Sequence, residues 1–423
     1  MNTLPEAENA AYEVLKKVLI GGAYSSVELD RTLDRVHEQH RPKTTALVYG
    51  VLDKSVALDY AVGRLTARPP KPALGVLLKL ALYESLFGGT PVYAAANKYV
   101  SFAKTRMRGT EKFVNAVMRA STKLIFPEAG DDALSISVAY SRPEWLVKRM
   151  IGDLGAERTR SVIGAELPHL THIRRNSIVI SEKAFEDKIN KFSGFLPSDR
   201  GYYVTRNTLK ALSPDEFTAQ SLSSMYAAEA YTAGLSGDLR ILDLCAAPGG
   251  KSVYMSELLP KAKITACDIH PHRVKLIQAY SARMRSKNIE AVVNDAVKLR
   301  SEWINSFDLV VCDVPCTGSG LLCTSPDILL GKSDGDVERL NEVQRAILSA
   351  AAQYVRSGGR LVYSTCSLLK AENECVTSEL ATDDGFRPVT EKSGKGSESD
   401  GKIRFFPDTD GCDGFYIARW TKR

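Results

Sequence analysis

The chain has 423 residues, of which 44% are hydrophobic and 25% are charged, and its formal net charge is +6 at pH 7. That length exceeds one ordinary domain, so we expect two or three domains, and the composition excludes a disordered or fibrous chain. The mild positive charge permits a polyanionic partner without requiring one, and no uninterrupted apolar run is long enough to cross a bilayer.

The N-terminus and the cysteines bear on where the protein works. Residues 1–11 carry acidic side chains where a secretory signal would carry basic ones, so we expect a cytoplasmic protein. All eight cysteines lie in the second half of the chain. In a cytoplasmic chain we expect them to be thiols, and without a Cys-x-x-Cys pair the sequence predicts no metal site.

Apolar residues recur at helical spacing over residues 6–124. Paired Gly or Pro residues interrupt the pattern at residues 21–22, 69–70 and 88–89. The sequence therefore predicts an all-α N-terminal domain over residues 1–135. Near its end lies a basic cluster: Lys98, Lys104, Arg106, Arg108, Lys112 and Arg119. The sequence leaves open whether this cluster is a solvated helix face or a surface that contacts phosphates.

Residues 136–225 mix short strands with helices. The β-branched and aromatic residues 178–180 and 202–204 resemble strands, and residues 182–192 have helical spacing. We predict a small α+β module here, whose composition alone indicates no function.

Strands and helices alternate from residue 226 to the end. This pattern predicts a parallel sheet with helices on both faces, which is an α/β Rossmann-like domain over residues 226–423. Most of the expected strands are continuous apolar runs, as buried parallel strands are: residues 239–244, 263–268, 290–294, 307–313 and 360–365. Residues 403–406 and 415–420 would add an edge hairpin, and the Ser/Gly-rich residues 393–401 are expected to form a mobile loop.

The first of these strands leads into a glycine loop, residues 244–252 (LCAAPGGKS). Glycines let a ligand approach the backbone, and the helix that follows offers free N–H groups. The loop would match the phosphate loop of an NTPase if Cys245 were Gly, with Lys251 and Ser252 in place. The alternative is the cofactor loop of a methyltransferase.

Three details favour the methyltransferase. The first glycine of a phosphate loop is missing, and Pro248 lacks the N–H that a phosphate would use. Asp268 ends the second strand, where such folds place a carboxylate on a ribose diol. Asp295 follows the third strand, where it would meet an adenine.

Two cysteines follow the fourth and fifth strands: Cys316 after Asp313, and Cys366 at the end of the fifth. Ligands of open α/β sheets bind outside the carboxyl ends of the strands, so we expect both thiols to face the crevice of the glycine loop. A thiolate can attack carbon 6 of cytosine and make carbon 5 nucleophilic, and a second group then assists breakdown of the adduct. A helix after Cys366, near Lys370, would favour the thiolate, and Asp313 would hydrogen-bond the base.

Four motifs resemble those of the bacterial 16S rRNA (cytosine-5) methyltransferases that carry an N-terminal NusB-like domain. They are residues 244–252 (LCAAPGGKS), 313–320 (DVPCTGSG), 364–367 (STCS) and 413–416 (DGFY). Residues 91–97 (PVYAAAN) and 112–119 (KFVNAVMR) are similar to the NusB-like part. The resemblance implies an RNA methyltransferase that uses S-adenosyl-L-methionine.

The resemblance also implies a role for each site residue. Cys366 is then the nucleophile, Cys316 helps to release the product, and Asp313 completes the catalytic group. The residues that would bind the cofactor are Cys245, Ala246, Ala247, Pro248, Gly249, Gly250, Lys251, Asp268, Arg273, Asp295 and Asp313. The NusB-like domain and the middle module would grip RNA.

The implied target is cytosine 967 of 16S ribosomal RNA, in RNA that is free or early in subunit assembly. Thr324 and Ser325 stand where the family usually has a basic residue and a His, which leaves the exact nucleotide open. Other hypotheses are a tRNA or 23S ribosomal RNA target, an RNA-dependent ATPase, and a non-enzymatic RNA-binding protein. We expect no membrane association and no obligate protein partner.

Overall fold

The computed structural model describes residues 4–381, 385–392 and 394–423, which form two compact units. The first unit contains the described residues up to Ile163 together with Ser325–Ser333, and the second contains Gly164–Thr324 and Asp334–Arg423. Within the described ranges, no helix combines the length and the apolar character needed to pass through a membrane.

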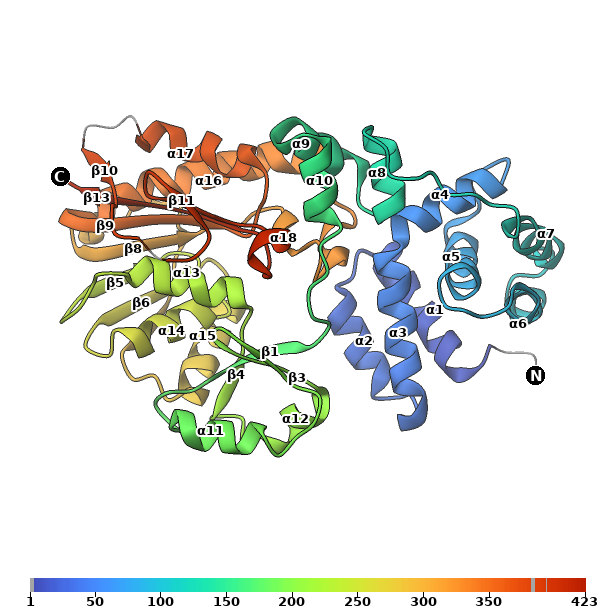
Figure 1. Cartoon of the computed structure of the whole chain (residues 1–423), viewed down its shortest axis with the longest axis horizontal. Coiled ribbons are helices and arrows are strands. Elements are labelled where there is room, and N and C mark those ends of the chain that lie inside the picture. Colours follow the sequence, from blue (N-terminus) through green and yellow to red (C-terminus); the bar gives the residue numbers. More distant parts are fainter. Residues whose placement is uncertain (1–3, 382–384, 393) are drawn as a thin grey trace. The chain divides into compact units, whose positions relative to one another are not determined.

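The first unit is built from helices (Figure 1). They are α1 (Glu6–Leu19), α2 (Ser25–Leu33), α3 (Arg41–Asp53), α4 (Ser55–Leu65), α5 (Pro72–Leu86), α6 (Val92–Arg106), α7 (Glu111–Ser121), α8 (Ala133–Tyr140), α9 (Glu144–Leu154) and α10 (Ala156–Ile163). Leu15, Val51, Leu77, Phe102 and Val117 come from five of these helices and share one buried core. The predicted all-α N-terminal domain is confirmed.

One member of the basic cluster lies inside this unit. Lys98 Nζ is 2.6 Å from Glu8 Oε1 and 2.9 Å from Glu84 Oε2, and both carboxylates are buried. Lys98 therefore neutralises acids whose removal from water would otherwise be costly. The other five members are exposed, so the open question of a phosphate-contacting surface concerns them alone.

Ser325–Ser333 belongs to the first unit although the chain on either side of it belongs to the second. The Ser25 hydroxyl donates a hydrogen bond to the Asp327 carboxylate, and Leu330 packs against the helical core. This packing cannot be predicted from local sequence patterns, because Ser25 and Asp327 are 302 positions apart.

A mixed sheet lies at the centre of the second unit, with strand order β11-β12-β13-β9-β8-β5-β6-β7 and with β10 paired to β13. The strands are β5 (Arg240–Asp243), β6 (Lys263–Asp268), β7 (Ile289–Val293), β8 (Phe307–Asp313), β9 (Val355–Thr365), β10 (Phe386–Pro388), β11 (Ser397–Ser399), β12 (Lys402–Phe405) and β13 (Phe415–Lys422). The pairs among β5 to β9 are parallel, and β13 is antiparallel to β9. Strand order reverses at β5, between β6 and β8, which is the position where such sheets bind ligands.

Helices cover both faces of this sheet (Figure 1). One face carries α13 (Leu222–Thr232), α14 (Gly250–Leu258) and α15 (Pro271–Arg283), and the other carries α16 (Asp334–Tyr354) and α17 (Glu374–Ala381). Val310 packs into the core under α16, and the next residue, Val311, packs into the core under α13. Both faces of each central strand are therefore apolar, and the predicted α/β Rossmann-like domain is confirmed.

The middle module contains a second, antiparallel sheet with strand order β2-β3-β1-β4. Its elements are β1 (Thr171–Arg175), α11 (Glu182–Ile189), β2 (Leu196–Ser198), β3 (Gly201–Val204), α12 (Arg206–Ala211) and β4 (Phe217–Ala219). The predicted α+β module is confirmed. The strand expected at residues 202–204 is β3, and the helix expected from residue 182 ends at Ile189.

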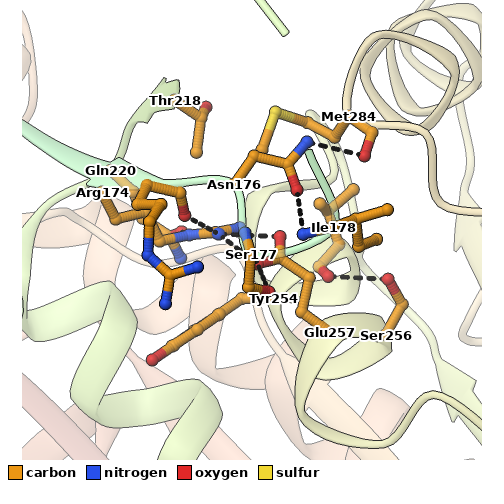
Figure 2. Close-up of polar contacts among 12 residues, drawn as sticks. Arg174, Asn176, Ser177, Ile178, Thr218, Gln220, Tyr254, Ser256, Glu257 and Met284 are labelled. Atoms are coloured by element: carbon orange, nitrogen blue, oxygen red, sulfur yellow. Dashed lines mark hydrogen bonds and ion pairs between the residues drawn. The ribbon is translucent and has the colours of Figure 1, made fainter. Parts of the chain in front are cut away.

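The strand predicted at residues 178–180 is wrong, because these residues form a turn after β1. Figure 2 shows the cause, which is the side chain of Asn176. Its Oδ1 accepts the N–H of Ile178 at 3.1 Å, and its Nδ2 donates to the carbonyls of Asp215 and Met284, each at 2.9 Å. An Asn that hydrogen-bonds the backbone two residues further on favours a turn, even before β-branched residues.

The structure also differs from the expected loop at residues 393–401 and from the expected domain boundaries. The loop expected at residues 393–401 contains β11, which pairs with β12, and residue 393 lies outside the described residues. The predicted boundary near residue 135 falls inside the first unit, and the boundary near residue 225 falls inside α13. The division into three functional domains stays a prediction.

A buried ion pair joins the middle module to α14 (Figure 2). Arg174 Nη1 donates to both carboxylate oxygens of Glu257, at 2.7 and 2.8 Å, and each side chain is only 3% exposed. Arg174 Nε donates to Gln220 Oε1 at 2.6 Å, and its guanidinium lies 4.4 Å from the centre of the Tyr254 ring. The module is therefore held against the Rossmann-like domain by directional contacts.

We expect Glu257→Ala to lower the free energy of unfolding by about 3–5 kcal/mol, because it leaves the Arg174 guanidinium buried without its anion. Urea unfolding followed by circular dichroism would measure this loss. The control is Glu302→Ala, which breaks a pair with Arg300 in which the Glu302 side chain is 58% exposed. A loss no larger than that of the control would contradict the expectation.

Candidate active site

The carboxyl ends of β8 and β9 bring two cysteines together. The strands are parallel neighbours, and Asp313 at the end of β8 pairs with Ser364 of β9. Cys316 and Cys366 follow these ends, and their Sγ atoms are 3.0 Å apart. The two thiols thus share one site, as the sequence predicted, while their roles stay predictions.

The backbones of the two cysteine loops are closely packed. The N–H of Gly320 donates to the carbonyl of Cys366 at 2.9 Å, and the N–H of Gly414 donates to the carbonyl of Gly320 at 2.9 Å. A Cβ atom on Gly320 would lie 2.0 Å from the Gly414 carbonyl oxygen. The PCTGSG and DGFY motifs therefore contact each other through a glycine that no larger residue can replace.

A chain of polar contacts leads from the glycine loop to the end of β9. Lys251 Nζ lies 2.7 Å from Asp313 Oδ2, and the Ser364 hydroxyl donates to Asp313 Oδ1 at 2.9 Å. The Ser364 hydroxyl also bonds the buried hydroxyl of Tyr231, at 2.5 Å. Asp313 is therefore held in place from both sides, while 23% of its side chain stays exposed. Neither contact of Ser364 can be read from the sequence, because Asp313 and Tyr231 lie on other elements.

The two thiols have different electrostatic surroundings. The hydrogen bond with Cys366, burial and the nearby charge of Glu372 raise the pKa of Cys316 well above that of an ordinary thiol. Burial alone would lower the pKa of Lys251, but Asp313 and then Cys366 outweigh it and raise that pKa. Lys251 therefore stays charged in this site.

The helix expected after Cys366, near Lys370, is present as a 3₁₀ turn from Lys370 to Glu372 that is followed by α17 from Glu374. Lys370 itself is exposed. A second cation, Lys251 of the glycine loop, is distant in sequence, and the charge of Cys366 helps to raise its pKa. In a phosphate loop, Lys251 would bind a phosphate. Here its ionic partner is the Asp313 carboxylate.

The glycine loop turns sharply from β5 into α14. Gly249 has φ +111°, a conformation that favours glycine, and a Cβ there would contact α15 at Ile277. Ala246 and Ala247 pack with Ile277, whereas Pro248 is exposed. Burial raises the pKa of Cys245 well above its ordinary value, so this cysteine is a neutral thiol.

Acidic side chains follow three neighbouring strands beside this loop. Asp268 Oδ1 accepts the N–H of His270 at 3.0 Å, and its Oδ2 lies 3.2 Å from Nη1 of Arg273. Arg273 Nη2 also donates to the Ala247 carbonyl at 3.2 Å, so it ties Asp268 to the loop. Asp295 Oδ1 accepts the N–H of Val297 at 3.2 Å.

A third carboxylate, Asp243 at the end of β5, is not apparent from the sequence because it lies within an apolar strand pattern. It is 2% exposed, its Oδ2 accepts the Ser252 hydroxyl at 2.6 Å, and its Oδ1 has no hydrogen-bond partner among the described residues. Carboxylates after β5, β6 and β7 fit the hydroxyl and amino groups of S-adenosyl-L-methionine.

Thr324, which stands where the family usually has a basic residue, hydrogen-bonds an acid in this structure. The Thr324 hydroxyl donates to Asp413 Oδ1 at 2.6 Å, and burial raises the pKa of Asp413. A neutral donor therefore meets this acid where the family usually has a basic residue. Ser325 begins the segment that packs in the first unit.

Comparison with known proteins gives consistent results over the whole chain. A family model described as "16S rRNA methyltransferase RsmB/F" matches residues 232–421, and the NusB family model matches residues 6–123. A relative in Bacillus subtilis named "Probable ribosomal RNA small subunit methyltransferase B" is 32% identical, over 98% of this chain and 98% of its own. The protein named "Ribosomal RNA small subunit methyltransferase B" in Photorhabdus laumondii is 28% identical, over 97% of each chain.

Solved structures agree on the fold. The crystal structure of PH0851 covers 99% of both chains with a TM-score of 0.82 and 22% identity. The structure of NSun6 from Pyrococcus horikoshii with SFG covers 66% of this chain and 98% of its own, with a TM-score of 0.58 and 22% identity.

We expect Asp243→Asn to be more stable than the wild type at neutral pH, by an amount that shrinks as the pH falls. Burial raises the pKa of Asp243 from 3.8 to about 6, with Asp313 adding to the rise while Ser252 and Lys251 oppose it. The folded protein thus binds this proton more tightly than the unfolded chain, so wild-type stability declines as the pH rises from 3.8 to about 6. Because Asn carries no charge, the free energy of unfolding of the variant does not decline in this way.

The difference should be on the order of 3 kcal/mol above pH ~6.5 and should approach zero near pH ~4. Urea unfolding at several pH values would measure it, with Asp238→Asn at an exposed position as the control. A difference that does not change with pH would contradict the assignment of a buried, weakly acidic Asp243.

Proposed function

Since the chain belongs to the 16S rRNA methyltransferase RsmB/F family and is therefore an S-adenosylmethionine-dependent RNA cytosine-5 methyltransferase, we propose that it methylates one cytosine of 16S ribosomal RNA through a covalent bond to Cys366. The observation that carries the proposal is the contact between the sulfur atoms of Cys366 and Cys316, 3.0 Å apart, beside the Lys251–Asp313 pair. Two thiols, one cation and one carboxylate at a cofactor loop suit this reaction better than phosphate transfer.

The reaction begins at Cys366. Its sulfur, as the thiolate, forms a bond to carbon 6 of the cytosine, and electron density moves to carbon 5. Lys251 stabilises the negative charge near Cys366, and Asp313 would accept a hydrogen bond from the amino group at the ring edge of the base, which fixes the base in place. The target base must leave its stack to reach these groups.

The second half of the reaction releases the product. When bound, S-adenosyl-L-methionine would supply the methyl group to carbon 5 and leave as S-adenosyl-L-homocysteine, so that carbon 5 carries both a methyl group and a hydrogen. Water takes up that proton, the electrons reform the double bond between carbons 5 and 6, and the bond from carbon 6 to sulfur breaks. The S–H of Cys316 donates a hydrogen bond to the departing thiolate of Cys366, because Cys316 stays protonated.

The cofactor would be held by the glycine loop and by the acids that follow the neighbouring strands. Gly249 and Gly250 let it approach the backbone, and Asp268 and Asp295 suit its ribose and its adenine. Asp243 would accept from a polar group with the oxygen that has no partner among the described residues.

The RNA target is tested with radiolabelled S-adenosyl-L-methionine and three unmodified RNAs: 16S rRNA, 23S rRNA and a tRNA pool. We expect label in 5-methylcytidine of 16S rRNA, and bisulfite sequencing should place it at cytosine 967. Free RNA should accept more label than assembled small subunits, since assembly buries stable rRNA positions. Label confined to tRNA or 23S rRNA would overturn the choice of target.

We expect Cys366→Ala to lower methyl transfer by roughly a thousandfold or more, because it removes the atom that activates carbon 5. Single-turnover transfer of labelled methyl to 16S rRNA measures this. The matched control is Cys375→Ala, which changes an exposed thiol and should keep wild-type activity. Methyl transfer at the wild-type rate in Cys366→Ala would contradict the covalent mechanism.

We expect Cys316→Ala to accumulate a covalent protein–RNA complex, because attack by Cys366 continues while release is impaired. The complex is seen as a slower band on a denaturing gel and should approach one RNA per protein. Adding Cys366→Ala to the same protein should abolish the band. Normal turnover of Cys316→Ala without any adduct would refute a role for Cys316 in release.

A further inference from the structure

A buried carboxylate lies between the two cysteine loops, and the reaction described above does not use it. Glu372 is 0% exposed and ends the 3₁₀ turn that follows β9. Burying a carboxylate costs several kcal/mol unless other groups satisfy its oxygens. The contacts of Glu372 are therefore a guide to what it does.

Each oxygen of Glu372 accepts two hydrogen bonds. Oε1 accepts the backbone N–H of Thr317 at 2.8 Å and Nε2 of Gln344 at 3.2 Å. Oε2 accepts the hydroxyl of Thr317 at 2.5 Å and the hydroxyl of Ser367 at 2.5 Å. Four donors on one carboxylate fix its position and the positions of the donors.

These donors adjoin the reactive sulfur atoms. Thr317 directly follows Cys316, and Ser367 directly follows Cys366. Gln344 also donates to the carbonyl of Pro315, at 2.9 Å, so the Cys316 loop is held on both sides of the cysteine. One carboxylate thus connects the loop of each thiol to the other.

The charge of Glu372 has a further consequence for the pair. In the part of the chain that the structure describes, its four partners are neutral groups, and no Lys or Arg pairs with it. An anion buried without a cation opposes a second negative charge nearby, and it contributes to the raised pKa of Cys316, after the hydrogen bond to Cys366 and burial. Cys366 has a cation near it instead, since its charge helps to raise the pKa of Lys251, after Asp313.

We propose that Glu372 is a positioning residue of the two-thiol reaction, which ties the Cys316 loop to the Cys366 loop and so keeps the two sulfur atoms in contact. It touches neither substrate nor cofactor in this role. The proposal rests on the proposed function for its catalytic meaning, but the geometry that it asserts can be measured without RNA.

The direct test measures the proximity of the two thiols with phenylarsine oxide, whose arsenic atom binds two neighbouring thiols at once. We expect Glu372→Ala to weaken binding of this probe by about tenfold or more, because the loops are no longer tied. Glu372→Gln keeps the shape and can keep the links, since the hydroxyls of Thr317 and Ser367 can also accept hydrogen bonds, and it should bind the probe nearly as well as wild type. Cys316→Ala shows the affinity for a single thiol.

Kinetics supply the second readout. We expect Glu372→Ala to lower kcat by about a hundredfold while KM for RNA and the Kd of S-adenosyl-L-methionine stay near wild type, because a displaced thiol impairs the reaction and not binding. Glu372→Gln should restore most of the lost kcat. Glu374→Ala is the matched control, because Glu374 lies two residues away and pairs with Arg404 instead.

Several outcomes would overturn the proposal. One is wild-type binding of the arsenical by Glu372→Ala, and another is a Gln variant as defective as Ala in both readouts. If Glu372→Ala fails to bind S-adenosyl-L-methionine and so is misfolded, Thr317→Val and Ser367→Ala each remove one link and should each weaken arsenical binding. Unchanged binding in both would count against the proposal. A wild-type protein that methylates no RNA refutes the proposed function, while the arsenical result still decides the role of Glu372.

Discussion

The distance between the two thiols depends on the pairing of β8 with β9. Parallel neighbours end at the same edge of a sheet, and the register that sets Asp313 opposite Ser364 lets both cysteine loops emerge side by side. A slip of one residue would turn every side chain of the strand to the other face. Because Val310 and Val311 pack into opposite cores, burial far from the sulfur atoms holds this register and so sets the geometry of the site.

The two cysteines of the site have different buried charges near them. A charge removed from water must be paired or hydrogen-bonded, and the cation and the anion of this site are satisfied in different ways. Lys251 pairs with Asp313 near Cys366, whereas Glu372 accepts four neutral donors and opposes charge on Cys316. The charge of Cys366 helps to raise the pKa of the cation, and the anion contributes to the raised pKa of Cys316.

Polar contacts also hold the middle module against the Rossmann-like domain. An apolar contact tolerates sliding, but the two-oxygen pairing of Arg174 with Glu257 fixes an orientation. Asn176 adds two hydrogen bonds to backbone carbonyls, one of them at the end of α15. If the module grips RNA, such directional contacts would present the RNA at a constant angle to the glycine loop.

The sequence by itself determined the fold class, the glycine loop and the two cysteines, because continuous apolar strands and a strand–turn–helix signature are local patterns. It erred at residues 178–180, where β-branched residues favour a strand but a side chain of Asn176 imposes a turn. It also did not reveal that Lys251, which follows a different strand, lies close enough to Asp313 and Cys366 for their charges to raise its pKa. Only the tertiary structure decided the partners of Asp243, Lys251 and Glu372, since long-range strand pairing brings together groups that no spacing along the chain reveals.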